Sequence, residues 1–199
     1  MIMCTYKQVC ITNRHLTDNL PRQVERAIEM GADIIILREK DLPDDEYRPL
    51  AMEIMNICDA KGATCIVHSF WQIAIEIGCK NIHLTIDGAR TMPEYAWEHF
   101  GIVGVSTHTI EEAIECEKLG VSYVTASPIY HTQCKPDVAA RGLEYLSDVV
   151  NSVNIPVYAL GGISNDNSHE CIEAGASGVC MMSEYMRVGD RQYELGSKV

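Results

Sequence analysis

Eight short apolar runs recur along the chain, and the segments between them return an apolar residue every three or four positions. Each run is four to seven residues long and is apolar at both odd and even positions. This pattern is typical of strands that are buried on both faces, as in a parallel sheet. The predicted strands cover residues 6–12, 33–37, 64–67, 81–84, 101–106, 122–126, 156–160 and 178–182.

The segments between the runs predict amphipathic helices. Within residues 19–30, Val24, Ala27 and Ile28 share one helix face, and residues 44–60 and 110–119 have helical spacing as well. Several of these segments end on a glycine that can adopt the left-handed conformation closing a helix, and an apolar run follows each one. These glycines are Gly31, Gly62, Gly78, Gly120 and Gly175.

Strand and helix therefore alternate from one end of the chain to the other. Eight parallel strands with alternating helices predict an α/β protein, a single (β/α)8 TIM barrel. No change in composition separates two parts, so residues 1–199 are expected to form one domain, with a short final helix after Ser183. A doubly wound open sheet is the alternative, because it has the same alternation.

Composition narrows the possible partners. The chain has 199 residues, 47% hydrophobic and 22% charged, and a net charge of −12. So acidic a protein is not expected to bind nucleic acid or an anionic membrane. No apolar stretch approaches the roughly 20 residues of a membrane span, and the first residues lack the basic start of a secretory signal. We therefore expect a cytoplasmic protein.

Nine cysteines occur without any C-x-x-C spacing. Most of them lie in apolar runs, which indicates buried thiols in a reducing compartment rather than disulfides or a zinc site. Cys134 is the exception, because it lies in a polar loop.

In a (β/α)8 barrel the active site forms from the loops that follow the strands. The polar loop of residues 127–142, after the sixth strand, is the longest of these and holds His131, Thr132 and Lys135. The other loops contribute Arg38 and Lys40, His68 and Ser69, Asp87, Ser106, the pair Gly161-Gly162, and Met182 with Ser183.

The last two loops predict a phosphate site. Glycine lets backbone N–H groups approach an anion closely, and the loops after strands seven and eight are the usual phosphate site of barrel enzymes. The alternative is that Gly161-Gly162 only makes a tight turn.

Five ordered motifs carry a family resemblance: "ILREKD", "GVSTHT", "SPIYHTQCKPD", "ALGGIS" and "GVCMMS". From residue 6 to about residue 185 the chain resembles the thiamine phosphate synthase/TenI family. The resemblance implies a (β/α)8 barrel that acts on phosphorylated thiamine precursors.

The synthase branch of this family joins hydroxymethylpyrimidine diphosphate to a thiazole phosphate and releases pyrophosphate, using Mg²⁺. The resemblance implies that Arg38 and Lys40 bind the diphosphate. It also implies substrate contacts by Ser106, Thr132 and Lys135, and a phosphate cradle at Gly162, Met182 and Ser183.

The chain departs from the synthase pattern at three places. Ile36 replaces a glutamine that contacts the pyrimidine, and His68-Ser69 replaces an Asn-Asp pair that contacts diphosphate and metal. Residues 85–88 replace a metal-binding Gly-x-Glu-Asp stretch, which leaves Asp87 as the candidate Mg²⁺ ligand if the protein is a synthase.

The TenI branch resembles a thiazole tautomerase, which moves a proton on a thiazole carboxylate phosphate and needs neither metal nor pyrimidine. We therefore expect a tautomerase first, with no cofactor. A synthase with Mg²⁺ is the alternative, and a non-catalytic regulatory binder of a phosphorylated ligand is a second one. The expected partners are small molecules, a thiazole phosphate and, for a synthase, hydroxymethylpyrimidine diphosphate; the oligomeric state stays open.

A tautomerase needs a group that exchanges a proton near neutral pH, which suits histidine. The catalytic position of the TenI branch is Pro128 in this chain, and His131 follows three residues later. We predict His131 as the acid/base and His68 as its rival, while His131 could instead be a solvated loop residue. His83 is expected to be a structural barrel histidine.

Overall fold

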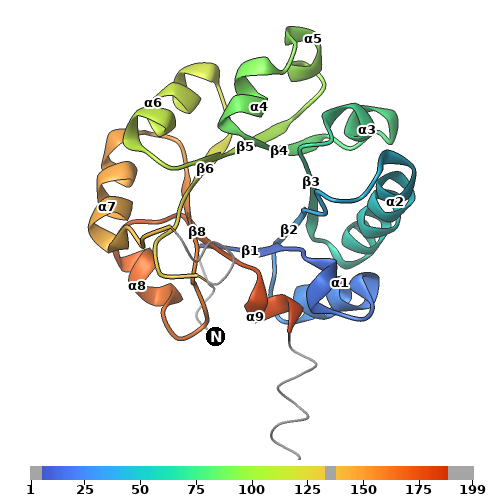
Figure 1. Ribbon diagram of the computed structural model, residues 1–199, viewed down its shortest axis with the longest axis horizontal. Coiled ribbons are helices and arrows are strands. Elements are labelled where there is room, and N and C mark those ends of the chain that lie inside the picture. Colours follow the sequence, from blue (N-terminus) through green and yellow to red (C-terminus); the bar gives the residue numbers. More distant parts are fainter. Residues whose placement is uncertain (1–5, 133–137, 188–199) are drawn as a thin grey trace, which may run out of the picture.

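The structure, a computed structural model, describes residues 6–132 and 138–187. Eight parallel strands close into a barrel in chain order, each paired with the next and β8 paired with β1 (Figure 1). The predicted (β/α)8 barrel is therefore confirmed, and the open sheet is excluded. The strands are β1 (Lys7–Ile11), β2 (Ile34–Leu37), β3 (Thr64–His68), β4 (Asn81–Thr85), β5 (Ile102–Thr107), β6 (Tyr123–Ala126), β7 (Val157–Leu160) and β8 (Gly178–Met181).

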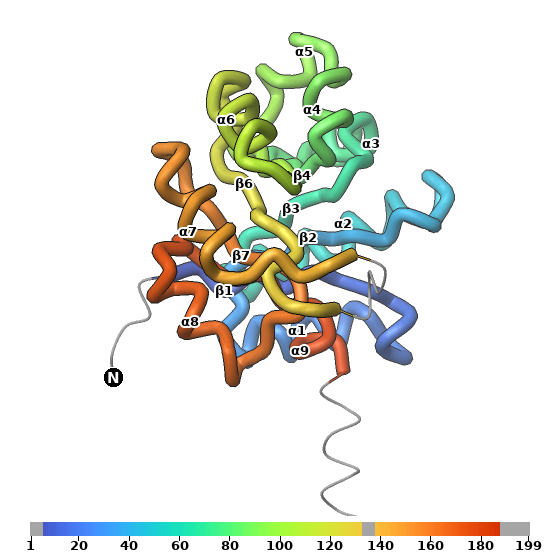
Figure 2. The backbone as a smooth tube through the Cα atoms, turned by 60° about the vertical axis from the view of Figure 1, so that its left-hand side comes forward, coloured from blue at the N-terminus to red at the C-terminus, as the bar shows by residue number. Residues whose placement is uncertain are grey.

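Helices surround the barrel (Figure 1). Two short helices instead of one connect β4 to β5, and α9 packs beside α1 in both views (Figures 1 and 2). The final described helix has only four residues, as expected. The helices are η1 (Arg14–Leu16), α1 (Leu20–Glu29), α2 (Asp44–Lys61), α3 (Trp71–Glu76), α4 (Ile86–Thr91), α5 (Glu94–Trp97), α6 (Ile110–Leu119), α7 (Gly142–Ser152), α8 (Ser168–Glu173) and α9 (Ser183–Met186).

The junctions from helix to strand follow the sequence signals. All five expected glycines have a positive φ, which L side chains rarely adopt. Gly62, for example, ends α2 at φ 75° and donates its N–H to the carbonyl of Asp59. At the other end of a helix, the Asn19 side chain accepts the N–H of Arg22 and caps α1.

Alternate residues of each strand supply two different cores. One parity faces the helices, as Ile35 and Leu37 of β2 do. The other parity fills the barrel, where Ile34 and Ile36 pack with Tyr123 and other interior residues. Burial of both parities explains why the strands are apolar throughout.

The cysteines in the described residues are free and buried, as the sequence indicated, and Cys4 and Cys134 lie outside the described residues. Among residues 6–132 and 138–187, no helix is both long and apolar enough to cross a membrane.

Candidate functional site

The loop after β2 is held by a buried carboxylate. Glu39 is 2% exposed, and the Thr12 hydroxyl at the end of β1 donates to its Oε1 at 2.6 Å. The same hydroxyl oxygen accepts the backbone N–H of Arg38 at 2.9 Å. Thr12 therefore joins the ends of β1 and β2 and fixes the backbone between Arg38 and Glu39.

Arg14 completes this network. Its backbone N–H donates to Glu39 Oε2 at 3.1 Å, and its guanidinium forms two hydrogen bonds to Asp41 at 2.6 and 2.7 Å. The guanidinium holds the pKa of the Asp41 carboxyl well below its usual range, with His15 adding a further hydrogen bond. Both carboxylates of the loop are therefore paired with Arg14.

Two histidines stand side by side, one at the end of β3 and one in the middle of β4. The rings of His68 and His83 stack at 5.5 Å between centroids, and both side chains are buried. His68 Nδ1 is hydrogen-bonded to Ser69 Oγ at 2.8 Å. Ser69 has a φ of 69°, an uncommon conformation for a residue other than glycine and one that often marks functional sites.

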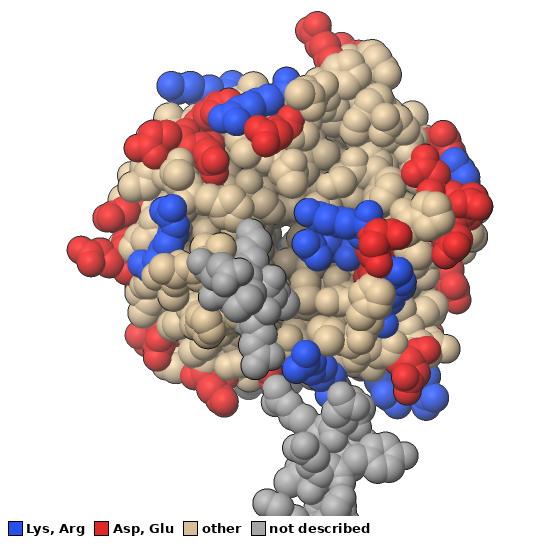
Figure 3. All heavy atoms as spheres, viewed as in Figure 1, with Lys and Arg blue, Asp and Glu red and all other residues tan. Residues whose placement is uncertain are grey.

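Both histidines are neutral. Burial lowers the pKa of His83 to about 3, and the positive charges of Lys40 and Arg38 contribute to that shift. Burial likewise lowers the pKa of His68 well below its usual value, with further contributions from His83, Lys40 and Arg38. The positive charges of Arg38 and Lys40 therefore lie close enough to the two imidazoles to influence both of them. Figure 3 shows basic side chains gathered beside the opening at the centre of this face, over the end of β2.

His83 also connects to the predicted substrate residue Ser106. Its Nε2 lies 2.8 Å from Ser106 Oγ, and its Nδ1 lies 2.9 Å from the Tyr123 hydroxyl. Ser106 is half-buried. The structure thus brings four predicted site residues into one region at the barrel mouth: Arg38, Lys40, His68 and Ser106.

The loops after β6 and β7 pack closely against each other. Tyr130 donates its N–H to the carbonyl of Gly161 at 2.9 Å. A Cβ on Gly161 would lie 2.8 Å from Pro128 Cα, and one on Gly162 would overlap the carbonyl oxygen of His131. Glycine is therefore required here for close packing of the two loops, which is compatible with the tight-turn alternative as well as with a phosphate site.

The predicted acid/base His131 lies on this packed loop, with an exposed side chain. Among the described residues, no hydrogen bond or ring contact links His131 to the four residues at the mouth. Thr132 is half-buried, and Lys135 lies outside the described residues. Whether His131 reaches a substrate therefore stays a prediction.

Met182 lies between β8 and α9, and Ser183 is the first residue of α9. Met182 is the residue before the first turn of α9, and the Asn13 amide donates to its Sδ at 3.6 Å. Ser183 is exposed.

The position of Asp87 does not support a magnesium site. It lies in the first turn of α4, where its side chain is 84% exposed and pairs with Arg90 at 3.0 Å. Mg²⁺ takes oxygen ligands in octahedral geometry, whereas the end of β3 offers a neutral imidazole and a hydroxyl. Within the described parts of the chain, no three His, Cys, Asp or Glu side chains are grouped to hold a metal. The described residues of the mouth do not fit a protein-held Mg²⁺.

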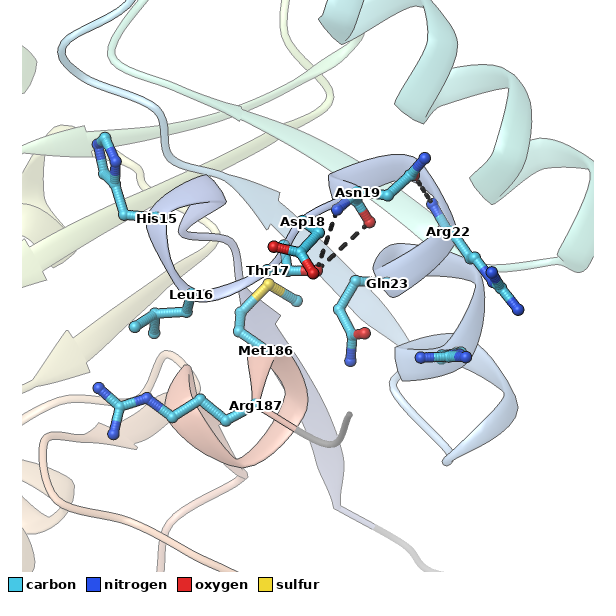
Figure 4. Close-up of a pocket in the computed structure, with 10 residues that line it drawn as sticks. His15, Leu16, Thr17, Asp18, Asn19, Arg22, Gln23, Met186 and Arg187 are labelled. Carbon is cyan, nitrogen blue, oxygen red and sulfur yellow. Dashed lines mark hydrogen bonds between the residues drawn. The ribbon is translucent and has the colours of Figure 1, made fainter. Parts of the chain in front are cut away.

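A separate cavity of about 530 Å³ lies between α1 and α9 (Figure 4). It is lined by arginines, but the guanidinium groups of Arg22 and Arg187 point to opposite sides in Figure 4. None of the predicted site residues lines it. This cavity is therefore not the candidate active site.

Sequence reasoning did not identify Thr12, Arg14 and Tyr123 as parts of the site. Thr12 could have been noticed as a polar residue directly after the first strand. Tyr123 lies at an inward-facing strand position, and Gly104 on the neighbouring strand leaves room for its ring. Arg14 gave no comparable signal.

The fold and the mouth define a (β/α)8 barrel whose chemistry-bearing side chains gather at the carboxyl ends of the strands, as in TIM-barrel enzymes. A family model described as thiamine monophosphate synthase matches residues 8–185. The chain belongs to this family, as the sequence motifs indicated.

Relatives with curated names support the same family. The chain is 34% identical over 184 residues to a thiamine-phosphate synthase of Clostridium acetobutylicum, covering 89% of this chain and 86% of that protein. It is 35% identical over 187 residues to the thiamine-phosphate synthase of Pyrococcus horikoshii, covering 92% and 88%. The structure of a thiamine phosphate pyrophosphorylase from Pyrococcus furiosus superposes with a TM-score of 0.82 at 31% identity, covering 95% of this chain and 91% of that one.

Proposed function

We propose that this chain joins hydroxymethylpyrimidine diphosphate to a thiazole phosphate and releases pyrophosphate, the reaction of a thiamine-phosphate synthase. Support comes from relatives of that name that match nearly the whole chain. The sequence motifs alone favoured a tautomerase, and the names of the relatives move the preference to the synthase.

The observation that carries this proposal is the pair of cations at the end of β2. A departing diphosphate develops negative charge, and fixed positive groups in a preorganised site stabilise that charge. Burial is the main cause of the lowered pKa of both histidines, and the charges of Arg38 and Lys40 lower it further, so these charges act at the barrel mouth. The neighbouring carboxylates of Glu39 and Asp41 are paired with Arg14, which leaves a net positive mouth.

The remaining predicted residues divide between the two substrates. Ser106, half-buried beside His83, offers a hydroxyl to the diphosphate. Gly161, Gly162, Met182 and Ser183 would hold the thiazole phosphate through the two loops that commonly bind phosphate in barrels. Thr132 and Lys135 belong to the loop after β6, which packs against the glycine pair.

A thiazole tautomerase is the second candidate, and the residues at the end of β3 favour it. At the end of β3 the neutral imidazole of His68 and the hydroxyl of Ser69 stand where the synthase pattern has the Asn-Asp pair that contacts diphosphate and metal. In this candidate His68 is better placed than His131, because it is buried beside the cations whereas His131 is exposed. Burial is the main cause of the lowered pKa of His68, and an anionic substrate bound to Arg38 and Lys40 would offset the further lowering by these two cations.

One assay separates the candidates. The protein is incubated with hydroxymethylpyrimidine diphosphate, thiazole phosphate and Mg²⁺, and in parallel with a thiazole carboxylate phosphate plus a chelator. The synthase proposal predicts thiamine phosphate in the first reaction, with Asp87→Asn retaining near-native activity because that carboxylate faces solvent and Arg90. Conversion in the second reaction alone would establish the tautomerase, and conversion in neither would leave a non-catalytic binder.

A further inference from the structure

A buried polar chain crosses three neighbouring strands below the mouth. It runs from the Tyr123 hydroxyl on β6 through both ring nitrogens of His83 on β4 to Ser106 Oγ on β5. Tyr123 is 3% exposed and His83 is 2% exposed. Since Ser106 is half-buried, it is the end of the chain that a ligand can reach.

We propose that Tyr123 and His83 are positioning residues that hold the Ser106 hydroxyl with its hydrogen directed into the barrel mouth, as a donor to a phosphate oxygen. The phosphate as ligand rests on the proposed function, whereas the direction of the hydrogen bonds rests on the buried chain alone.

The backbone of β5 makes the chain possible. Gly104 pairs with His83 on one side and with Tyr123 on the other. A Cβ at Gly104 would overlap the ring and hydroxyl of Tyr123, so only glycine lets this ring lie across β5 and reach His83. Ser106, two residues further along β5, faces the same side of the strand and meets the other ring nitrogen.

The direction of the hydrogen bonds follows from the fact that each group has few partners. Burial raises the pKa of Tyr123 well above its usual value, so the phenol keeps its proton. Among the described residues His83 Nδ1 is the one acceptor that this hydroxyl meets, so Tyr123 donates to it. Neutral His83 then carries its single proton on Nε2 and donates to Ser106 Oγ.

The opposite direction is unfavourable. If Ser106 donated to Nε2 and Nδ1–H donated to Tyr123, the buried phenolic hydrogen would have no acceptor among the described residues. An unpaired buried donor of this kind disfavours that arrangement by roughly 5- to 150-fold. The Ser106 oxygen is therefore an acceptor for His83, and its hydrogen is left for an oxygen of the ligand.

The first test is the tautomer of His83, read by ¹⁵N NMR of the imidazole nitrogens at pH 7 without ligand. His83→Gln identifies the signals by their disappearance. We expect the Nε2-protonated tautomer in the native chain and a rise of the Nδ1-protonated form in Tyr123→Phe. A native ring protonated at Nδ1, or no change in Tyr123→Phe, would overturn the proposal whatever reaction the protein catalyses.

The second test is a double-mutant cycle on the binding of inorganic pyrophosphate, measured by calorimetry. Ser106→Ala should weaken binding by roughly tenfold or more, and Tyr123→Phe by roughly threefold to tenfold. In the Ser106→Ala background, Tyr123→Phe should add nothing, because its effect passes through the serine. Equal losses in both backgrounds would contradict the positioning role.

Tyr158→Phe is the matched control. Its ring stacks on Tyr123 at 4.7 Å in the same interior cluster, and none of the described hydrogen bonds uses its hydroxyl. This variant should leave pyrophosphate affinity and the His83 tautomer unchanged, and thermal unfolding checks that each variant folds. Failure of the native chain to bind pyrophosphate would count against the proposed function, while the tautomer measurement would still decide the positioning role.

Discussion

Glu39 illustrates how single buried atoms hold a charged loop in place. Both of its oxygens have donors: the Thr12 hydroxyl on one side, and the backbone and guanidinium of Arg14 on the other. Arg38 donates its backbone N–H to the same threonine hydroxyl, so the carboxylate also helps to fix the position of the Arg38 backbone. Glu39 thus acts on the neighbouring Arg38 through hydrogen bonds made by Thr12.

Replacing this carboxylate should therefore disturb the loop. In Glu39→Gln an amide NH₂ would face a donor on one side, so we expect a loss of about 1–3 kcal/mol in the free energy of unfolding, measured with urea. The affinity for diphosphate should fall with it. Glu115→Gln is the control, since this exposed carboxylate only pairs with Arg90 and should leave both quantities near native. Native stability in Glu39→Gln would show that the network does not hold the loop.

At the scale of elements, the strands and helix ends could be predicted because their causes are local. Two-sided burial made the strands apolar throughout, and left-handed glycines such as Gly62 mark helix ends. Arg38 and Lys40 could be assigned to the site because they directly follow a strand. The pairings Thr12–Glu39 and His83–Tyr123 could not be predicted, because they join residues 27 and 40 positions apart that only the closed barrel brings together. Asp87 was assigned to the mouth from its place after a strand, but it lies inside the first turn of α4 and faces Arg90.

The contact between the loops after β6 and β7 allows a test at the same scale. Gly162→Ala combines a left-handed backbone with an overlap against the carbonyl of His131. We expect a loss of about 2–3 kcal/mol of stability and weaker phosphate binding, read by urea unfolding and calorimetry. Gly120→Ala has a similar φ of 80° but open space around its Cβ, so it should lose about 1 kcal/mol. Equal losses would mean that backbone conformation alone requires the glycine.

For the molecule as a whole, the charge at the barrel mouth is opposite in sign to the net charge of the chain. The chain carries a net charge of −12, yet Arg38 and Lys40 make the mouth locally positive beside two neutral histidines. An acidic surface does not attract anionic ligands at long range, so affinity for them has to come from the groups at the mouth. A consequence of this arrangement is that the two buried imidazoles resist protonation.

The two histidines predict how stability depends on pH. Their pKa values are lowered on folding, so the unfolded chain binds protons that the folded chain excludes. Stability is therefore full above about pH 6.5 and falls as the pH drops toward the folded pKa of His83, about 3, by up to about 1.4 kcal/mol per pH unit for each histidine. Urea unfolding between pH 7 and 5, above the range of most carboxylates, measures this slope. His83→Gln should make it shallower, and an unchanged slope would show that His83 is not the group involved.

The central claim is that the positive mouth at the end of β2 is where the reaction occurs. Its most direct test is kcat/KM for thiamine phosphate formation in Arg38→Gln compared with Arg26→Gln, a matched arginine that lies on α1 and lines the separate cavity. We predict a loss of roughly 10²- to 10³-fold in Arg38→Gln, because a fixed charge on the departing diphosphate is removed, and near-native rates in Arg26→Gln. Near-native rates in Arg38→Gln together with a large loss in Arg26→Gln would place the chemistry outside the barrel mouth and contradict this account.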